Sequence, residues 1–320
     1  MAAHADWSLD PRKRWIAAAR RGPEGWRIGA PALVGDVATL LARLGAAAAG
    51  APVALGLDLP LGLPRDYVER HAARLAADFP SFLRGLAHSP DFFRVAGSLD
   101  DIRPERPFYP ARGEAGMTRA AHAAALGLEG AAALCRACDR ATAERPAGAP
   151  PFWTLGANQS GKAALHGWRE LLLPALAAPS PLLLWPFDGP FRRLLTPAAV
   201  AVAETYPAEA LRHFGLKLAG SKRRQADRAA LAAPLFAAMA ALDAAPDRAL
   251  AAQVADGFGA DAAGEDRLDC TLGLLCVLNV LAGNRPDTAP ADPWIQRWEG
   301  WVLGQTALPS AHKTVLCSAP

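Results

Sequence analysis

The chain has 320 residues, of which 52% are hydrophobic and 20% are charged, so it can bury a large core. Its formal net charge of +3 is too small to indicate nucleic-acid binding by itself. Its apolar runs fall short of the ~18 residues that a membrane span needs, and the N-terminus lacks the pattern of a signal peptide. We therefore expect a cytoplasmic protein with no membrane partner.

The N-terminal segment carries the pattern of three short strands. Apolar and polar residues alternate over residues 3–9 with the period of two that is typical of a strand. Asp10-Pro11 predicts a turn, and residues 22–25 predict a second turn between strands over residues 14–19 and 26–29. Because both turns are short, the three strands should form an antiparallel meander.

A helix and a fourth strand follow the meander. Residues 34–49 predict a helix, with Asp36 in its first turn and Gly50 just after its end. Residues 53–58 are almost continuously apolar, as expected of a strand that is buried on both faces. A strand that is reached through a helix should lie parallel to a neighbour in the same sheet.

Residues 61–180 differ from the segments on either side, and we interpret them as a helical insertion. Helical patterns over residues 66–79, 118–142 and 162–176 alternate with proline-rich loops. Such an insertion could cover a substrate bound to the rest of the chain.

The core should therefore combine two separate segments, residues 1–60 and 181–285. The second segment predicts strands over residues 182–187 and 200–204 and helices over residues 207–214, 223–242 and 266–281. Residues 286–320 form a tail that we expect to pack on the core as far as about residue 303 and then to fray.

Four acidic residues mark the ends of short apolar runs. Asp6, Asp58 and Glu204 end three such runs, and Asp269 opens an apolar helix. A buried carboxylate is costly unless it is compensated, and Mg²⁺ or Mn²⁺ bound through oxygen would compensate all four. Asp266 shares a helix face with Asp269 and competes with it as the ligand, but it could equally cap the helix. The alternative for the whole series is a set of turn residues and a helix cap.

Several separated blocks, together about half of the chain, resemble one family. The blocks are Asp6-Trp7-Ser8, Gly56-Leu57-Asp58-Leu59-Pro60-Leu61-Gly62, Ala203-Glu204-Thr205-Tyr206-Pro207-Ala208-Glu209, Ser221-Lys222-Arg223-Arg224 and Glu265-Asp266-Arg267-Leu268-Asp269. They resemble a bacterial and archaeal domain-of-unknown-function family, which is described as predicted ribonuclease-H-like nucleases. The predicted element order agrees with that fold.

The resemblance implies an α/β, ribonuclease-H-like mixed sheet, in which an antiparallel meander joins parallel strands and a helical insertion interrupts the core. In that fold the first and fourth strands are adjacent and parallel, so Asp6 and Asp58 would lie side by side. The resemblance also implies a metal-dependent nuclease, with Asp6, Asp58, Glu204 and Asp269 as catalytic ligands. Two ions about 3.5–4 Å apart could then activate a water and stabilise the leaving oxygen of a phosphodiester.

A basic cluster opens the helix that follows the Glu204 strand. Lys222 and Arg223 belong to it and could contact a phosphate backbone close to the metal site. The partner would be a nucleic acid, either DNA, RNA or a hybrid. The alternative is a solvated helix end.

Residues 156–163 nearly match a phosphate-binding loop. The spacing Gly-x-x-x-x-Gly-Lys is present, but Ala163 replaces the Ser or Thr that would hold Mg²⁺. We interpret the segment as a polar loop at a helix N-terminus, with Lys162 near phosphate and Trp153 supplying a flat apolar surface. A glycine-containing connector with a solvated lysine explains the same residues.

The five cysteines form an odd and sparse set, which fits reduced thiols. Cys135 and Cys138 have the spacing of metal ligands, but no second pair follows them. The surrounding alanines predict a helix, so both side chains should serve helix packing.

Two alternatives to a nuclease come from other functional classes. The first is a non-catalytic ribonuclease-H-like module that binds nucleic acid or protein. The second is an ATP-dependent phosphotransferase, which would use the loop over residues 156–163 or the chemistry of the actin-like relatives of this fold.

Overall fold

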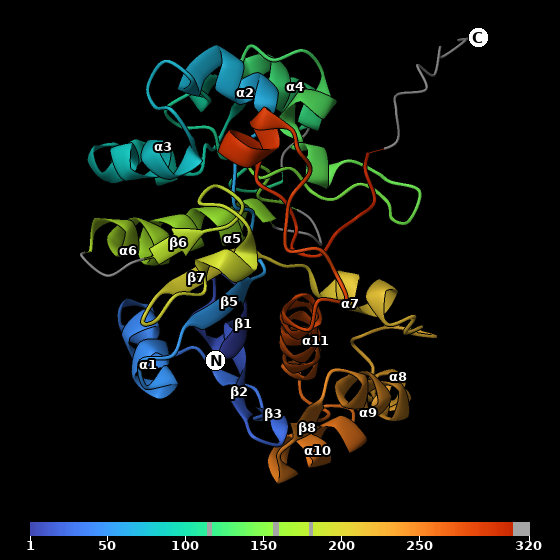
Figure 1. Ribbon diagram of the computed structural model, residues 1–320. Helices are drawn as coiled ribbons and strands as arrows, with labels where there is room; N and C mark the ends of the chain where they lie inside the picture. The colour runs from blue at the N-terminus through green and yellow to red at the C-terminus, as the bar shows by residue number, and fades with distance from the viewer. Residues whose placement is uncertain (114–116, 156–159, 179–181, 310–320) are drawn as a thin grey trace.

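The computed structural model describes residues 1–113, 117–155, 160–178 and 182–309, and the following account concerns these residues. Eight strands in them form a single mixed sheet (Figure 1). They are β1 (Ala2–Asp6), β2 (Trp15–Gly22), β3 (Gly25–Ile28), β4 (Ala32–Leu33), β5 (Val53–Leu57), β6 (Leu182–Leu184), β7 (Val200–Glu204) and β8 (Ala244–Pro246). The order across the sheet is β6-β7-β5-β1-β2-β3-β8, and β4 pairs with β2.

The N-terminal part of the sheet has the predicted pairing. β1, β2 and β3 form an antiparallel meander, and β5 lies parallel to β1, with Ala5 opposite Leu57. β7 and β6 extend the parallel part beyond β5. The first strand is shorter than predicted and ends at Asp6 rather than at residue 9, because Asp10 turns the chain by capping a short helical turn over Pro11–Lys13.

Helices cover both faces of the sheet. α1 (Leu40–Ala48) and α5 (Ser160–Gly167) pack on one face, and α11 (Gly264–Leu281) packs on the other. Figure 1 shows α1 and α11 on opposite sides of the central strands. Because both faces are covered, β1 is buried from Ala2 to Ala5, and its last residue, Asp6, is half-buried.

α11 approaches β1 closely because two glycines leave room for the His4 ring. A Cβ atom on Gly273 would lie 2.2 Å from His4 Cε1 and Nε2, and one on Gly56 would lie 3.0 Å from His4 Cδ2. The imidazole is completely buried, and its two nitrogens have no hydrogen-bond partner. Burial lowers the pKa of His4 to about 3, so the ring is neutral in the folded protein.

We expect Gly273→Ala to lower the free energy of unfolding by about 1–3 kcal/mol, because the new methyl group overpacks the contact with His4. The matched control is Gly45→Ala in α1, where a Cβ meets nothing within 4 Å. That change should instead stabilise the protein by about 0.5–1 kcal/mol through helix propensity. Urea denaturation measures both, and His4→Ala should restore part of the loss in Gly273→Ala. A Gly273→Ala protein as stable as Gly45→Ala would contradict the packing argument.

The insertion is mainly helical. Figure 1 shows α2, α3 and α4 grouped on the side of α5 and α6 that is away from the central strands. The bounds are α2 (Arg65–Tyr67), α3 (Phe79–Gly85), α4 (Arg119–Ala125), α5 and α6 (Leu173–Ala177). A turn of π-helix over Trp168–Leu172 joins α5 to α6, which confirms the helix predicted over residues 162–176. The helix predicted over residues 66–79 instead ends near Ala72, after a π-helical turn over Val68–Ala72.

The helix predicted over residues 118–142 is wrong beyond α4. Gly127 and Gly130 adopt φ values of +69° and +77°, which end a helix and which glycine tolerates best. Short 3₁₀ turns over Ala131–Leu134 and Ala137–Asp139 follow, with extended backbone at Cys135 between them. Cys135 and Cys138 therefore lie in a looped segment rather than on a helix.

The second core segment has more elements than predicted. α7 (Pro207–His213) agrees with the sequence, but the helix predicted over residues 223–242 consists of α8 (Gln225–Ala229) and α9 (Ala232–Ala241). β8 and α10 (Arg248–Ala255) were not predicted. Within the described residues, every helix is too short or too polar to cross a membrane.

The C-terminal segment packs back on the protein as far as the described residues extend. It connects the insertion to the core, because Trp298 O accepts a hydrogen bond from Leu63 N (2.8 Å) and Leu303 N donates to Glu204 O (2.9 Å). Trp298 belongs to a π-helical turn over Ile295–Glu299. The C-terminal segment therefore joins the start of the insertion to the end of β7.

Candidate functional site

Asp6 and Asp58 lie at the C-terminal ends of two neighbouring parallel strands. Asp58 N donates a hydrogen bond to Ala5 O (3.0 Å), which aligns the two strand ends. Residues alternate between the faces of a strand, so Asp6 shares a face with His4, and Asp58 shares one with Gly56. His4 and Gly56 both meet α11, so the two aspartates also face α11.

The first two turns of α11 bring two further carboxylates to the same place. Asp266 and Asp269 are three residues apart and therefore share one face of the helix. Negative charge on Asp58, Asp269 and Asp266 raises the pKa of Asp6, in addition to the larger effect of burial. The structure thus gathers Asp6, Asp58, Asp266 and Asp269, which the sequence spreads over more than two hundred residues.

These aspartates line a cavity of about 620 Å³ between the core and the insertion. The core contributes the ends of β1 and β5 and the start of α7 and α11. The insertion contributes the start of α5 and residues 145–149. The lining residues that carry charge are Asp6, Lys13, Asp58, Arg145, Lys162, Arg212, Lys222, Glu265, Asp266 and Asp269.

Burial raises the pKa values of the four aspartates. Burial is the largest cause that raises the pKa of Asp58, and the nearby Asp269 charge raises it further. The neighbouring Asp6 carboxyl group lowers the pKa of Asp58 in part. Burial raises the pKa of Asp269 as well, and burial raises that of Asp266 to about 6. A group of this kind favours either protons or a bound cation at neutral pH.

Lys222 supplies one cation to this group. Its Nζ forms an ion pair with Asp269 Oδ1, and the two side chains are 22% and 18% exposed. Although burial lowers the pKa of Lys222, the Asp269 carboxylate outweighs it and raises the pKa overall. The ammonium therefore stays charged beside the Asp269 carboxylate.

No protein-family model, curated protein or solved structure matches this chain. The assignment of a function therefore depends on the geometry of the site.

The structure separates the four predicted substrate-binding residues into two pairs. Lys162 and Lys222 line the cavity. The Arg223 side chain is 84% exposed and lies outside the lining, where its nearest acidic partner is Glu265 at 4.0 Å. Trp153 is buried in the insertion against Tyr109 and has Arg119 over its ring, so it offers no surface to the cavity.

The structure describes only part of residues 156–163, the segment that nearly matches a phosphate-binding loop. Residues 156–159 lie outside the described residues. Ser160 to Ala163 form the first turn of α5, where Ser160 Oγ donates to Ala149 O (3.1 Å). Lys162 therefore reaches the cavity from a helix start, as the sequence predicts.

Glu204 lies outside the aspartate group because its side chain is on the other face of the sheet. It pairs with Leu57, which lies in the core under α1 together with Val202, two positions before Glu204. The next residue, Thr205, is the one that faces α11, because its Oγ1 lies 2.7 Å from the position of a Cβ on Gly56. A strand alternates its side chains, so Glu204 cannot join Asp58 on one face.

A buried arginine binds Glu204 instead. Arg136 Nη1 and Nη2 donate to Glu204 Oε2 and Oε1 at 2.6 and 2.7 Å, and the same guanidinium donates to Asp139 Oδ1 and Oδ2 at 2.9 and 3.0 Å. Glu204 also accepts a hydrogen bond from Leu61 N (2.7 Å). The three charged side chains are at most 1% exposed. This network fastens the insertion to β7.

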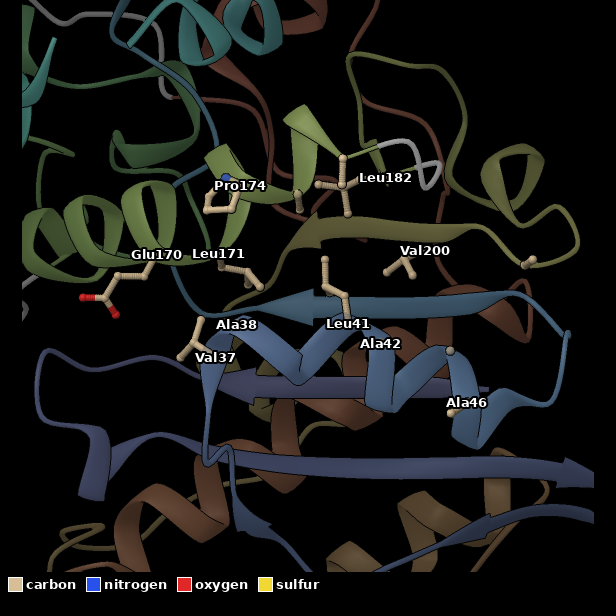
Figure 2. A pocket seen from close by; sticks show the side chains of 14 residues that line it. Val37, Ala38, Leu41, Ala42, Ala46, Glu170, Leu171, Pro174, Leu182 and Val200 are labelled. Carbon is tan, nitrogen blue, oxygen red and sulfur yellow. The ribbon is translucent and has the colours of Figure 1, made fainter. Parts of the chain in front are cut away.

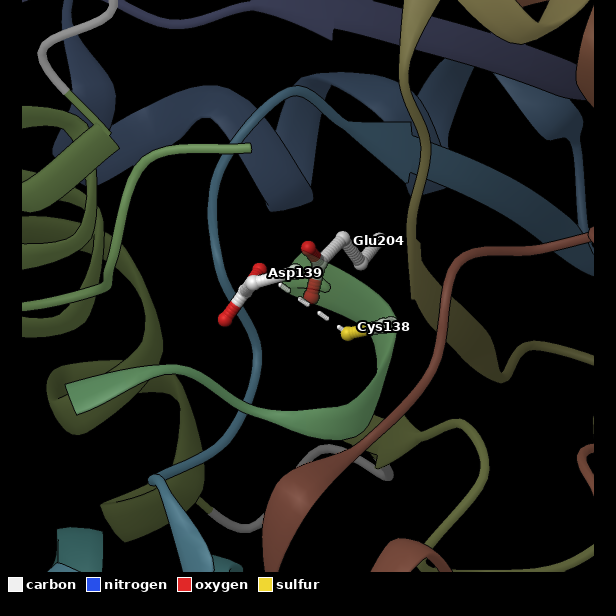
Figure 3. A group of neighbouring side chains, drawn as sticks. All are labelled: Cys138, Asp139 and Glu204. Carbon is white, nitrogen blue, oxygen red and sulfur yellow. Dashed lines mark hydrogen bonds between the residues drawn. The ribbon is translucent and has the colours of Figure 1, made fainter. Parts of the chain in front are cut away.

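The Glu204 carboxylate also belongs to a group with the composition of a metal site. In the described residues, Cys138, Asp139 and Glu204 are the one set of three donors within 4.8 Å of one another (Figure 3). Arg136 already supplies the positive charge there, and burial raises the pKa of the Cys138 thiol well above its usual value. A neutral thiol beside an occupied carboxylate pair is a poor metal ligand, so we assign this group a structural role. The four cysteines in the described part of the chain are free thiols.

Glu299 closes the network and gives it a pH dependence. Its Oε1 accepts a hydrogen bond from Ala137 N (3.0 Å), and burial raises its pKa to about 7. A carboxyl whose pKa is raised on folding stabilises the protein below its unfolded pKa, and this stability is lost as the pH rises through 7. A shift of this size corresponds to at most about 3 kcal/mol.

We therefore expect Glu299→Gln to gain stability relative to the wild type as the pH rises from 4.5 to 8. The glutamine keeps an oxygen for Ala137 N but never carries the buried charge. The difference between the two free energies of unfolding, measured in urea at several pH values, should grow by about 1–3 kcal/mol over this range. A difference that stays constant with pH would show that folding does not raise the pKa of Glu299.

A second cavity, of about 390 Å³, lies between α1, α6 and the ends of β6 and β7 (Figure 2). Its lining is apolar apart from Glu170, the one titratable side chain among the described lining residues. Glu170 accepts hydrogen bonds from Arg14 and pairs with His166, each at 2.8 Å. These contacts occupy the carboxylate, so the groove offers no reactive group.

The sequence did not point to several residues of the aspartate cavity. Lys13 follows the Asp10-Pro11 turn, and Arg145 and Arg212 belong to segments interpreted as loop and surface helix. Tyr206 is present in the block that carries the family resemblance, which was the available signal for it. Lys13, Arg145 and Arg212 could be assigned to the cavity only from the structure, because no sequence motif connects them.

Proposed function

We propose that the protein is a metal-dependent nuclease that hydrolyses phosphodiester bonds with the aspartates of the large cavity. The observation that carries this proposal is the convergence of Asp6, Asp58 and Asp269, three half-buried carboxylates from three elements, on a cavity lined by basic side chains. Each of their pKa values is raised. A divalent cation bound between these carboxylates would favour their charged forms and so offset the effect of burial.

The order of the strands supports the proposal. An antiparallel meander followed by a helix and a strand parallel to the first is the arrangement expected of a ribonuclease-H-like core. In such a core β1 and β5 would be the first and fourth strands, and their adjacent ends carry Asp6 and Asp58. The helical insertion enters after β5.

The donor set suits a hard cation. Asp6, Asp58, Asp266 and Asp269 offer only carboxylate oxygen, which Mg²⁺ and Mn²⁺ prefer and which zinc sites supplement with nitrogen or sulfur. In the described residues, no three of these aspartates have carboxylate oxygens within 4.8 Å of one another, whereas the donor atoms of Cys138, Asp139 and Glu204 do. Binding would therefore draw the carboxylates together, and Lys222 would adjust as Asp269 turned toward the ion.

The chain's own residues can then be given roles. Asp6, Asp58 and Asp269 would hold the ion, which would polarise the phosphate and lower the pKa of a bound water. Asp266, with a pKa of about 6, can accept a proton from the attacking water at neutral pH. The water oxygen bonds to phosphorus, the ester P–O bond breaks, and the leaving oxygen takes a proton from solvent. Lys222 and Lys162 would bind the phosphate oxygens.

Cleavage of labelled oligonucleotides tests the proposal. Single-stranded DNA, duplex DNA, RNA and an RNA–DNA hybrid are incubated with the protein and Mn²⁺ or Mg²⁺. We expect cleavage of at least one substrate, inhibition by EDTA, and a loss of at least about 100-fold in Asp6→Asn. Asp100→Asn, which changes an exposed aspartate of the insertion, is the control and should keep full activity. The proposal fails if none of the four substrates is cleaved, or if Asp6→Asn cleaves as fast as the control.

The Lys222–Asp269 ion pair favours a second candidate, a binding module that performs no chemistry. An internal ammonium at the carboxylates would make a metal unnecessary. Such a module would bind an oligonucleotide equally well in EDTA and in Mn²⁺, which calorimetry would detect.

A further inference from the structure

We propose that the large cavity accepts an unpaired nucleic-acid strand and excludes a duplex. This inference rests on the proposed function and specifies its substrate. It is carried by three features of the cavity: the partial burial of the carboxylates, the position of the insertion, and the distribution of basic side chains.

The carboxylates line the cavity and are partly buried. Asp6, Asp58, Asp266 and Asp269 are each half-buried, and the Asp269 side chain is 18% exposed. A phosphate must therefore enter the cavity to reach them. A duplex is wide and stiff, so one of its two backbones cannot bend into the cavity without the other.

The insertion forms a wall beside the carboxylates. Residues Arg145 to Ala149, together with Ser160, Lys162 and Ala163, line the same cavity as Asp6 and Asp58. Arg145 is fixed in place, because its side chain is 6% exposed and lies 3.5 Å from Glu209. The enclosed volume of about 620 Å³ falls within the range of about 300–1,000 Å³ that is typical of small-ligand pockets. It accommodates a nucleotide of one strand rather than a groove of a double helix.

Basic side chains line the cavity from both of its sides. Lys13 and Lys222 come from the core, and Arg145 and Lys162 come from the insertion. A strand between the two parts would bring its phosphates near cations on either side. Two aromatic residues of the described chain, Trp7 and Tyr206, line the cavity, and the half-buried Tyr206 is the more exposed of them, so a base can stack on its ring.

The test uses one DNA oligonucleotide in three forms: single-stranded, fully paired, and paired with an unpaired 3′ extension. Binding to Asp6→Asn is measured by fluorescence anisotropy with and without Mn²⁺, and cleavage is measured with the wild type. We expect the single strand to bind at least about tenfold more tightly than the blunt duplex, and the extension to restore binding. Cleavage should follow the same order.

Two variants probe the two sides of the cavity. Lys13→Met and Lys162→Met should each weaken binding of the single strand and reduce the slope of log K against log salt by about 0.7, the value for one phosphate contact. Arg248→Met on α10, an exposed residue outside the cavity, is the matched control and should change neither.

The outcomes separate this inference from the proposed function. Equal binding and cleavage of duplex and single strand would overturn the inference and leave the nuclease proposal standing. Preferential binding of the single strand without cleavage of any form would support the inference and contradict the nuclease. Binding that both lysine variants leave unchanged would also overturn the inference.

Discussion

Replacing Arg136 with methionine should lower the free energy of unfolding by about 3–5 kcal/mol, the usual cost of removing one partner from a buried ion pair. The Arg136 guanidinium is completely buried and donates to both Glu204 and Asp139. Methionine fills much of the same space but leaves two buried carboxylates without a counter-charge. The loss should be smaller at pH 5 than at pH 8, because the orphaned carboxylates can take up protons as the pH falls.

Urea denaturation at the two pH values measures the effect. Arg12→Met is the matched control, because the Arg12–Asp10 ion pair has 88% of the arginine side chain exposed, and its removal should leave stability unchanged. If Arg136→Met does not fold at pH 8, the triple variant that adds Asp139→Asn and Glu204→Gln should recover folding by removing the stranded charges. A loss below about 1 kcal/mol for Arg136→Met would mean that water satisfies both carboxylates.

This network also shows where inference from the sequence stopped. Glu204 ends an apolar run, as Asp6 and Asp58 do, and the sequence offered no reason to treat it differently. What separates it is the face of its strand, and that depends on the register of β7 against β5. Arg136 was hidden for another reason: it lies in an alanine-rich stretch that predicts a helix, and its partners are 3 and 68 residues away.

The elements that could be predicted are those with a strong local signal. The turn at Asp10-Pro11, the continuous apolar run before Asp58 and the long apolar pattern of α11 were all sufficient to place their elements. β8 could not be predicted, because its sequence Ala-Ala-Pro has little strand character and depends on pairing with β3. The proximity of Asp6 and Asp58 followed from the strand order, whereas the basic lining depended on the path of the insertion.

The effect of Asp58→Asn on the free energy of unfolding should change sign when a divalent metal is added. In the metal-free protein, burial and the Asp269 charge raise the pKa of Asp58, so ionised Asp58 destabilises the fold at neutral pH. A pKa raised on folding means that stability is lost as the pH rises through the folded pKa. The asparagine variant escapes this loss, so at pH 8 and in EDTA it should be more stable than the wild type by about 1–2 kcal/mol.

With Mn²⁺ the order should change, because the wild type gains a ligand that the variant has lost. Binding at 100 times the dissociation constant stabilises a folded protein by about 2.7 kcal/mol, which exceeds the advantage of the variant. Thermal unfolding in EDTA and in Mn²⁺ shows the reversal, and Asp100→Asn should behave as the wild type in both. Equal stabilisation of Asp58→Asn and the wild type by Mn²⁺ would place the ion elsewhere and remove the basis of the nuclease proposal. The change of order is a sharper test than either measurement alone. If Asp58 served only packing, the variant would be the more stable protein in EDTA and would remain so in Mn²⁺.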